Sequence, residues 1–368
     1  MIGSAKMMMK AVVTGPPPPP AGGLYSWGDN TYGELGSDST SARSSPVQVG
    51  AATDWGFVTG GHGDGGGIRA GALFMWGRSG QGEVGDGTRT ARSSPVPIGA
   101  ETDWTVVSNS GHASAGIRGG KLFTWGFNYQ GHLGDGTTDD KSSPVQIGAA
   151  TDWTTVSVGE YQMYGIRGGR LFAWGGGNFG QIGDGAATNR SSPVPIGALT
   201  DWTAVMAGRE FGMGIRAGLL FSWGKNQYGE LGDGTITTRS SPVPVGAEID
   251  WSSLARASGT GQSSFAIRGD KLFGWGSNAY YQLCDGTFAN RSSPIQIGAE
   301  TDWSVCSVGM DSAYGLRGGR LFAWGENAVS GALGLGDRVD RSSPVQVGAA
   351  TDWFEIAAQD YGALGVRS

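Results

Sequence analysis

The chain has 368 residues, including 69 glycines, 14 tryptophans, 3 histidines and 2 cysteines, and its formal net charge is −6. A surface that binds nucleic acid needs clustered Lys and Arg to neutralise phosphates, so this acidic composition argues against nucleic acid as a partner. No apolar run reaches the length of about 18 residues that a transmembrane helix needs, so we expect no membrane span.

Residues 1–21 differ in composition from everything that follows. They contain a small Met-rich segment and then the five consecutive prolines Pro16–Pro20, which favour an extended spacer of roughly 15 Å. The segment is short for a signal peptide and has no convincing cleavage site, so we expect it to be retained. We predict a tail over residues 1–21 that is either disordered or an anchor, with the anchoring residues Met7, Met8, Met9, Val12 and Pro18.

From residue 22 onward the chain repeats one unit. Each unit has one Trp in a segment like Leu-Phe-Ala-Trp-Gly and a second in an Asp-Trp pair, and these positions account for all 14 tryptophans. The seven copies of the first are Trp27, Trp76, Trp125, Trp174, Trp223, Trp275 and Trp324. A fixed period of this length is typical of propellers and other repeat architectures.

Within one unit, β-branched and aromatic residues indicate four short strands. In the third unit we place them at 145–148, 153–158, 164–167 and 170–174, with a two-residue hairpin at Gly168-Gly169. No segment shows a sustained period of 3.6 residues, so little helix is expected. The sequence therefore predicts an all-β fold over residues 22–368, a seven-bladed β-propeller of four-stranded antiparallel blades.

The two ends of the repeat region are complementary. The chain ends at Gly365–Ser368 in the third strand of a unit and begins at Gly22–Trp27 with a hairpin turn and a fourth strand. We therefore predict that the N-terminal strand completes the last blade and closes the ring, which removes the open sheet edges of a linear array.

The pattern WGxNxxGxLGDG followed by RSSPVxI resembles the repeats of the RCC1-like (regulator of chromosome condensation) family over residues 22–368. The resemblance implies a seven-bladed propeller. The family includes a guanine-nucleotide exchange factor for Ran, ubiquitin-ligase modules and proteins of unknown role. The exchange factor has a protruding β-wedge and a basic tail, whereas the length changes here are three residues near Gly259–Gln262 and one near Ser330.

Signals for catalysis or a cofactor are weak. Three histidines and two cysteines are too few and too scattered for a zinc site, and we expect the repeated Asp of Gly-Asp-Gly-Thr to cap a turn rather than to bind calcium. We expect the recurring Arg of Gly-Ile-Arg and the tryptophans to contribute to packing within the blades. We predict no enzyme activity, no metal and no cofactor. Pairing of Cys284 with Cys306 stays open.

Function is expected where the units differ. Strands of the same direction place the loop after the Asp-Trp strand and the segment after Trp-Gly on one face, opposite the hairpin turns and the tail. Variable aromatic and charged residues at these loops suit a binding surface, although neutral drift would also produce them. The candidate partner-binding residues are His62, Asp64, Arg78, His112, Phe127, Tyr129, Tyr161, Phe179, Arg209, Phe211, Tyr228, Tyr280, Tyr281, Asp311 and Tyr361.

We interpret the protein as a non-catalytic structural or binding propeller. Near-identical repeats and the opposition of tail and variable loops favour a phage virion protein, such as a capsid decoration or tail component. In that case the tail binds other virion proteins and the loop face meets a host-surface ligand. One alternative is an RCC1-like exchange factor or regulatory scaffold. The other is a secreted, lectin-like module. The expected location is the virion, or otherwise the cytoplasm.

Overall fold

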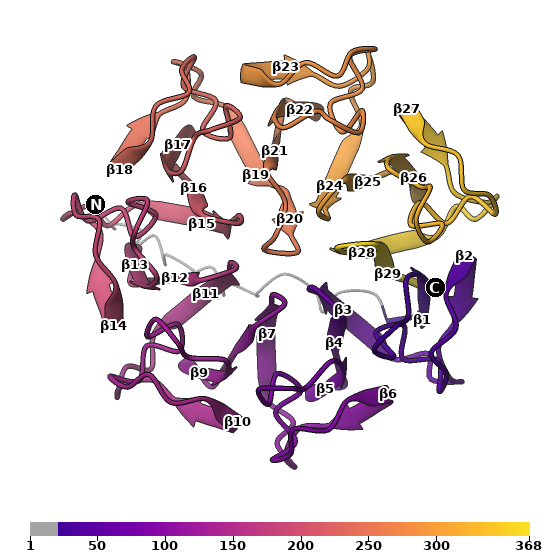
Figure 1. Ribbon diagram of the computed structural model, residues 1–368, viewed down its shortest axis with the longest axis horizontal. Coiled ribbons are helices and arrows are strands. Elements are labelled where there is room, and N and C mark those ends of the chain that lie inside the picture. The colour runs from indigo at the N-terminus through magenta and orange to yellow at the C-terminus, as the bar shows by residue number, and fades with distance from the viewer. Residues whose placement is uncertain (1–20) are drawn as a thin grey trace, which may run out of the picture.

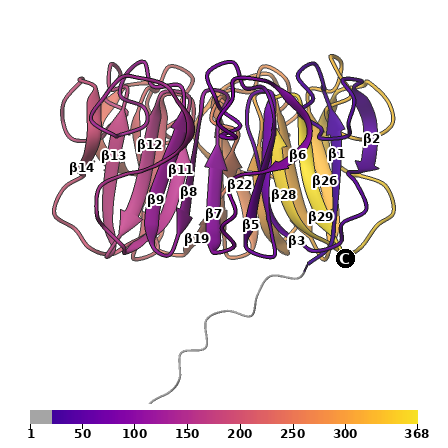
Figure 2. The same cartoon turned by 90° about the horizontal axis from the view of Figure 1, so that it is seen from below.

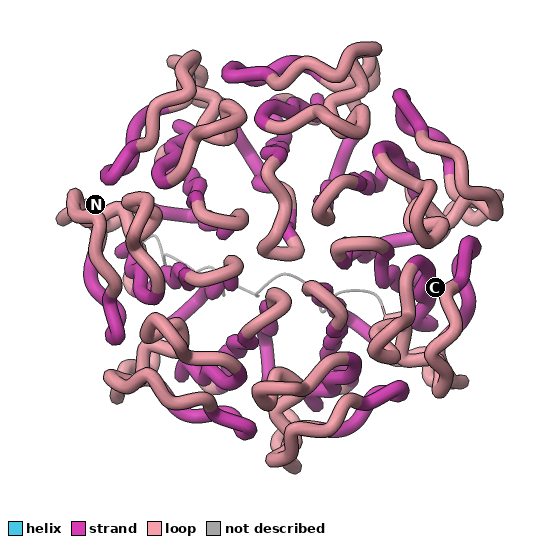
Figure 3. The backbone as a smooth tube through the Cα atoms, in the orientation of Figure 1, coloured by secondary structure: helices cyan, strands magenta, loops and turns pink. Residues whose placement is uncertain are grey.

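The computed structural model describes residues 21–368, which form seven β-sheets arranged as blades around a central axis (Figure 1). The predicted seven-bladed propeller is confirmed, and the described residues form strands and loops without a helix (Figure 3). No helix capable of crossing a membrane is therefore found in this part of the chain. The predicted anchor residues Met7, Met8, Met9, Val12 and Pro18 lie outside the described residues.

Each blade runs from an innermost strand at the axis to an outermost strand at the rim. The innermost strands are β3 (Trp55–Gly60), β7 (Trp104–Asn109), β11 (Trp153–Val158), β15 (Trp202–Ala207), β19 (Trp251–Leu254), β24 (Trp303–Val308) and β28 (Trp353–Gln359). The second strands are β4 (Asp64–Arg69), β8 (Ala113–Arg118), β12 (Gln162–Arg167), β16 (Phe211–Arg216), β21 (Ser263–Arg268), β25 (Ser312–Arg317) and β29 (Gly362–Arg367).

The outer half of each blade is built the same way. The third strands are β1 (Gly23–Gly28), β5 (Ala72–Gly77), β9 (Lys121–Gly126), β13 (Arg170–Gly175), β17 (Leu219–Gly224), β22 (Lys271–Gly276) and β26 (Arg320–Gly325). The outermost strands are β2 (Arg43–Gln48), β6 (Arg92–Pro97), β10 (Lys141–Gln146), β14 (Arg190–Pro195), β18 (Arg239–Pro244), β23 (Arg291–Gln296) and β27 (Arg341–Gln346).

The first predicted strand of each unit was placed too late in the sequence. In the third unit it was expected at 145–148, but β10 spans Lys141–Gln146 and pairs with β9 of the preceding repeat. The strand therefore includes the Ser-Ser-Pro segment, which alternation alone did not mark as a strand. A proline lacks the backbone N–H that would pair with another sheet, so its place on the rim protects this exposed edge.

The ring closes through the blade that combines the two ends of the chain. Its strand order is β2-β1-β29-β28, and all six residues of β1 pair with β29, from Gly23 with Arg367 to Gly28 with Gly362. The predicted closure by the N-terminal strand is confirmed, and β2 adds a second N-terminal strand to the same blade.

The tryptophans form the core between and within blades. We count the blade of β3–β6 as the first and the closing blade as the seventh. In the second blade (β7–β10), Trp104 and Trp125 meet edge to face with ring centroids 6.2 Å apart, and both are buried. Gly116 on β8 makes room for this arrangement, because a Cβ there would lie 2.6 Å from the Trp104 ring. Arg118 stacks on the outer side of Trp104 at 5.6 Å. The packing role predicted for the repeated Trp and Arg is thus confirmed in this blade.

The inner edges of the blades are satisfied by side chains of their neighbours. Ser108 Oγ accepts a hydrogen bond from the backbone N–H of Val158 at 3.1 Å, and Ser157 Oγ accepts one from Ala207 at 2.9 Å. Ser307 accepts an equivalent bond from Ala358. A serine hydroxyl at the fifth residue of one innermost strand therefore accepts a hydrogen bond from a backbone N–H of the next innermost strand. Without it, that N–H would stay unpaired at the open edge of the sheet.

The propeller has two different faces (Figure 2). One face carries the loops that join the innermost to the second strands, together with the long segments that lead to the outermost strands. We call it the loop face. The opposite turn face carries hairpins such as Gly168-Gly169, whose φ values of 52° and 71° confirm the predicted turn. The described chain begins and ends on the turn face, as the sequence predicted.

One inserted segment crosses the axis. After β19 the chain leaves its blade, forms the two-residue strand β20 (Arg256–Ala257) and pairs in parallel with β24, so that sheet has five strands. Gly259 then lies against Ser110 on the far side of the channel: a Cβ at Gly259, where φ is 87°, would approach the Ser110 Cβ to 2.6 Å. We call residues 258–261 the plug, because they cover the channel at the loop face (Figure 1).

Candidate functional site

The loop face gathers most of the predicted partner-binding residues into two groups. One group lies on the second to fourth blades and is mainly aromatic. The other lies where the closing blade meets the blade before it, and it is mainly acidic. The plug and the loop that carries His62 lie between the two groups.

The first group contains a row of stacked rings. Tyr129 and Phe127 are stacked with centroids 6.1 Å apart, Phe127 and His112 are 5.5 Å apart, and His112 stacks on Tyr161 at 5.9 Å. The side chain of Tyr129 is 69% exposed. Burial lowers the pKa of His112 to about 4, so the imidazole is neutral at pH 7 and behaves as another aromatic ring. We call these four residues the aromatic row.

Ion pairs surround the aromatic row. Arg209 Nε lies 2.6 Å from Glu160 Oε2, and Lys225 pairs with Glu210 while its Nζ stands 4.8 Å from the ring centroid of Phe179. The charges on this side of the loop face are therefore matched, and the aromatic surface dominates what a partner would meet.

The second group lines a cavity of about 510 Å³ that we call the acidic trough. Its wall contains the three carboxylates of Asp29, Asp311 and Glu326, one basic residue, Arg338, and the rings of Tyr280 and Tyr361. None of these three carboxylates forms an ion pair within residues 21–368, in contrast to the paired carboxylates beside the aromatic row. With three carboxylates and one guanidinium, the wall keeps a net negative charge, and two aromatic rings flank it.

Electrostatic crowding is visible in the acid groups of the trough. Burial, together with the nearby charge of Asp360, raises the pKa of Asp311 to about 6. Burial likewise raises the pKa of Glu326, and the charge of Asp311 adds to the effect. A cation bound in the trough would relieve this repulsion.

His62 is connected to the plug through Asp360. Its Nδ1 lies 2.5 Å from Asp360 Oδ2, and the other oxygen of Asp360 accepts a hydrogen bond from Thr260 in the plug. The bond to Asp360 raises the pKa of His62. Asp360 is 3% exposed, so this carboxylate holds the plug in place rather than offering itself to a partner.

Five predicted residues lie apart from these groups. Asp64 and Phe211 are each 1% exposed, so they support the loops from beneath, and burial raises the pKa of Asp64 well above its usual value. Tyr281 packs on Phe288 at 4.1 Å instead of joining the trough. Arg78 stands 3.7 Å from Glu83 and 6.0 Å from the ring of Tyr32, between the two groups. Tyr228 lies beside Gln227 on the fourth blade.

Sequence reasoning did not single out the residues that fill the centre of the ring. Thr260 belongs to the plug, and Arg256 and Glu355 support it. The three-residue insertion near Gly259–Gln262 was a signal for Thr260 and the neighbouring Arg256, whereas no signal marked Glu355. Arg256 stands where the other units have Gly, Asn, Val or Ala, which marks it as an exception to the repeat.

Within residues 21–368, no three His, Cys, Asp or Glu side chains come together in a way that would hold a metal ion. The two cysteines are not joined by a disulfide. Burial raises the pKa of both thiols, so neither is a reactive thiolate at pH 7.

Comparison with known proteins agrees with this architecture. The family described as "Regulator of chromosome condensation (RCC1) repeat" matches residues 21–61, 119–164, 168–215, 217–265 and 318–358. The chain belongs to the RCC1 repeat family. A search of curated proteins found no match to this RCC1-repeat protein.

Several solved structures share the fold of this RCC1-repeat protein. Human WBSCR16 is 19% identical with a TM-score of 0.82, and the match covers 94% of this chain and 98% of that one. Yeast RCC1 (Prp20), solved bound to Kap60, is 15% identical with a TM-score of 0.82 and coverages of 95% and 89%. A further structure of Prp20p from Saccharomyces cerevisiae is 16% identical, with a TM-score of 0.80 and coverages of 95% and 92%. At these identities the likeness establishes the fold.

Proposed function

We propose that this protein is a non-catalytic RCC1-type scaffold that binds a protein partner through its loop face. The observation that carries the proposal is the contrast between a uniform framework and a varied face. The blades repeat the same Trp, Gly and Arg packing, whereas equivalent loop positions carry the aromatic row in one region and the acidic trough in another. Loop variation on a rigid scaffold is how many binding surfaces are built.

The chemistry of the face favours a protein as the partner. The aromatic row exposes aromatic side chains, which contribute much of the binding energy at protein interfaces, and the charged residues beside it are already paired with one another. The acidic trough complements Lys or Arg side chains, whose cations also bind aromatic faces. A partner that presents apolar and basic side chains together would use both groups.

The related structures support protein binding in general. The structure of yeast RCC1 contains bound Kap60, and the second Prp20p structure is described with binding to Gsp1p and histones. The virion interpretation has no such support, and the RCC1-type regulatory scaffold is the better supported of the two readings.

Site-specific crosslinking tests the proposal. A photoreactive amino acid at Tyr129 or Tyr280 on the loop face should capture a partner in a lysate of the source organism. The same group at Lys121 or Lys271, beside hairpins of the turn face, is the matched control. The captured protein is then purified, and Tyr129→Ala with Tyr161→Ala should weaken its binding about tenfold or more. Capture only from the turn-face positions would contradict the proposal.

Regulation of a small GTPase is a second candidate function. It is favoured by the match to yeast RCC1 over nearly the whole chain. Against it, every strand within residues 21–368 belongs to a blade sheet, so this region has no separate protruding hairpin. A nucleotide-release assay with small GTPases decides the matter: no acceleration at micromolar protein would reject this candidate.

A further inference from the structure

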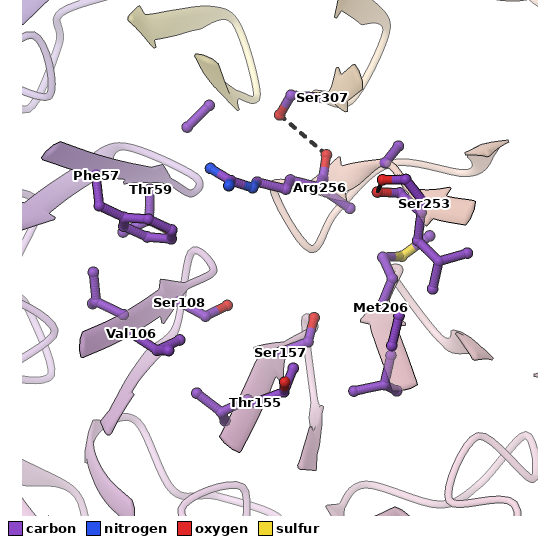
Figure 4. A pocket seen from close by; sticks show the side chains of 18 of the residues that line it. Phe57, Thr59, Val106, Ser108, Thr155, Ser157, Met206, Ser253, Arg256 and Ser307 are labelled. Atoms are coloured by element: carbon purple, nitrogen blue, oxygen red, sulfur yellow. Dashed lines mark hydrogen bonds between the residues drawn. The ribbon is translucent and has the colours of Figure 1, made fainter. Parts of the chain in front are cut away.

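The axis of the propeller contains a well that the loop-face groups do not use (Figure 4). Its volume is about 310 Å³, and its walls are the innermost strands of the blades. The lining reaches from Ser252, near the turn face, to Ala257, immediately before the plug. Because the plug crosses the axis above Ala257, the well is closed toward the loop face and is entered from the turn face.

Arg256 is the one charged side chain among the described residues that line the well. It lies near the axis, yet its side chain is 41% exposed, so its exposure is to the well. Its guanidinium carbon stands 4.7 Å from the centre of the Phe57 ring across the channel, and Figure 4 shows it extended over the open space.

The insertion is what turns Arg256 toward the axis. In the parallel pairing of β20 with β24, Arg256 is opposite Ser307, which lines the well. A change of pairing partner or register determines which face of a strand a side chain occupies. Residues at the same distance after the Asp-Trp tryptophan in other blades, such as Val158 and Ala207, are buried in the blades instead.

The guanidinium retains free hydrogen-bond donors. Its Nη1 binds Glu355 Oε1, and Glu355 is 7% exposed and not part of the lining. Within residues 21–368, Nε and Nη2 have no acceptor. Arginine presents its donors in a planar fork that matches a carboxylate with two parallel bonds, so part of this fork faces the well unused.

Two hydroxyls add donors at the same level. Ser108 and Ser157 line the well, and their oxygens accept backbone N–H groups from the next blade. Their own protons have no acceptor among the described residues. Val106 and Met206 contribute apolar surface to the wall near them (Figure 4), and Thr59, Thr155 and Ser253 are among the further hydroxyl residues of the lining.

We propose that the central well binds a small organic carboxylate. The carboxylate pairs with Arg256 and the Ser108 and Ser157 hydroxyls, and its apolar part contacts the wall. A concave pocket that combines apolar surface with a few convergent polar groups is the usual form of a small-molecule site. The source of the carboxylate is either a free metabolite or the C-terminus of a peptide that enters from the turn face.

Benzoate is a suitable probe, because it combines a carboxylate with a compact apolar ring, and benzamide is its neutral counterpart. Calorimetry or ligand-observed NMR on the full chain should show benzoate binding at least about tenfold more tightly than benzamide, the gain expected from hydrogen bonds to a charged group. A short peptide with a free C-terminus is compared with its amidated form. Preference for the peptide or for benzoate distinguishes the two sources.

Variants locate the site. Arg256→Met should lower benzoate affinity by about tenfold or more, whereas Arg239→Met, an equal change at an Arg of the outermost strand β18 that is paired with Asp233, should leave it unchanged. Glu355→Gln should tighten binding, because it removes the anion that competes for the guanidinium. If Arg256→Met fails to fold, Thr155→Phe fills the well without altering the Arg.

Each negative outcome overturns the proposal. Equal binding of benzoate and benzamide would show that charge recognition is missing. Binding that survives Arg256→Met or Thr155→Phe would place the ligand elsewhere. Absence of binding to every probe would mean that Arg256 serves as a strut between β20 and Glu355.

Discussion

The closing blade depends on contacts between the two ends of the chain, and one substitution tests how much they contribute. Leu24 on β1 is 0% exposed and belongs to a cluster with Val49, Trp55 and Leu364. Leu24→Ala removes three carbon atoms from this core. Buried Leu→Ala changes cost about 2–5 kcal/mol, depending on how far the cavity collapses. We expect about 3 kcal/mol, since rigid strands line the site on both sides.

Leu122→Ala is the matched control. Leu122 is also 0% exposed and occupies the same position on β9, in a blade made of one continuous segment. Urea unfolding followed by tryptophan fluorescence should show one transition in each variant, with midpoints lowered by similar amounts. A normal midpoint for Leu24→Ala beside a lowered one for Leu122→Ala would refute the reasoning, because β1 would then lie outside the cooperative unit.

Three further predictions follow from particular contacts. Gly259→Ala places a Cβ against Ser110 at a φ of 87°, so hydrogen exchange across residues 258–261 should become faster; unchanged protection would show that the plug tolerates the methyl group. Ser157→Ala leaves the Ala207 N–H unpaired and should cost about 1–3 kcal/mol in chemical denaturation, against little change for the exposed Ser143→Ala. Burial lowers the pKa of His132 to about 3. Since the unfolded chain takes up this proton near pH 6.5, stability should fall as the pH drops from about 6.5 toward 3, by roughly 2–3 kcal/mol at about pH 4.5. His132→Gln introduces the residue that stands at the equivalent position 181 of the next unit, and it should flatten this dependence of stability on pH. An unaltered dependence would exclude His132 as its cause.

Much of the loop face was accessible from the sequence, because departures from a strict repeat are visible without a structure. His112, Phe127, Tyr129 and Tyr161 were singled out as variable positions, yet their stacking into one row depends on the radial packing of neighbouring blades. Asp64 shows the limit of this reasoning. It sits at a variable loop position like the others, but its burial follows from the path of the chain around it.

The amino-acid sequence by itself determined the number of blades, the closure of the ring and the division into two faces. These follow from local physics: the spacing of Trp residues, glycines at left-handed turns and the alternation of strand residues repeat in every unit. The tertiary structure decided what occupies the axis. Ring closure brings Arg256, Glu355 and Phe57 together from three separate blades, and a three-residue insertion reveals neither its parallel pairing with β24 nor the side chain that it turns into the well.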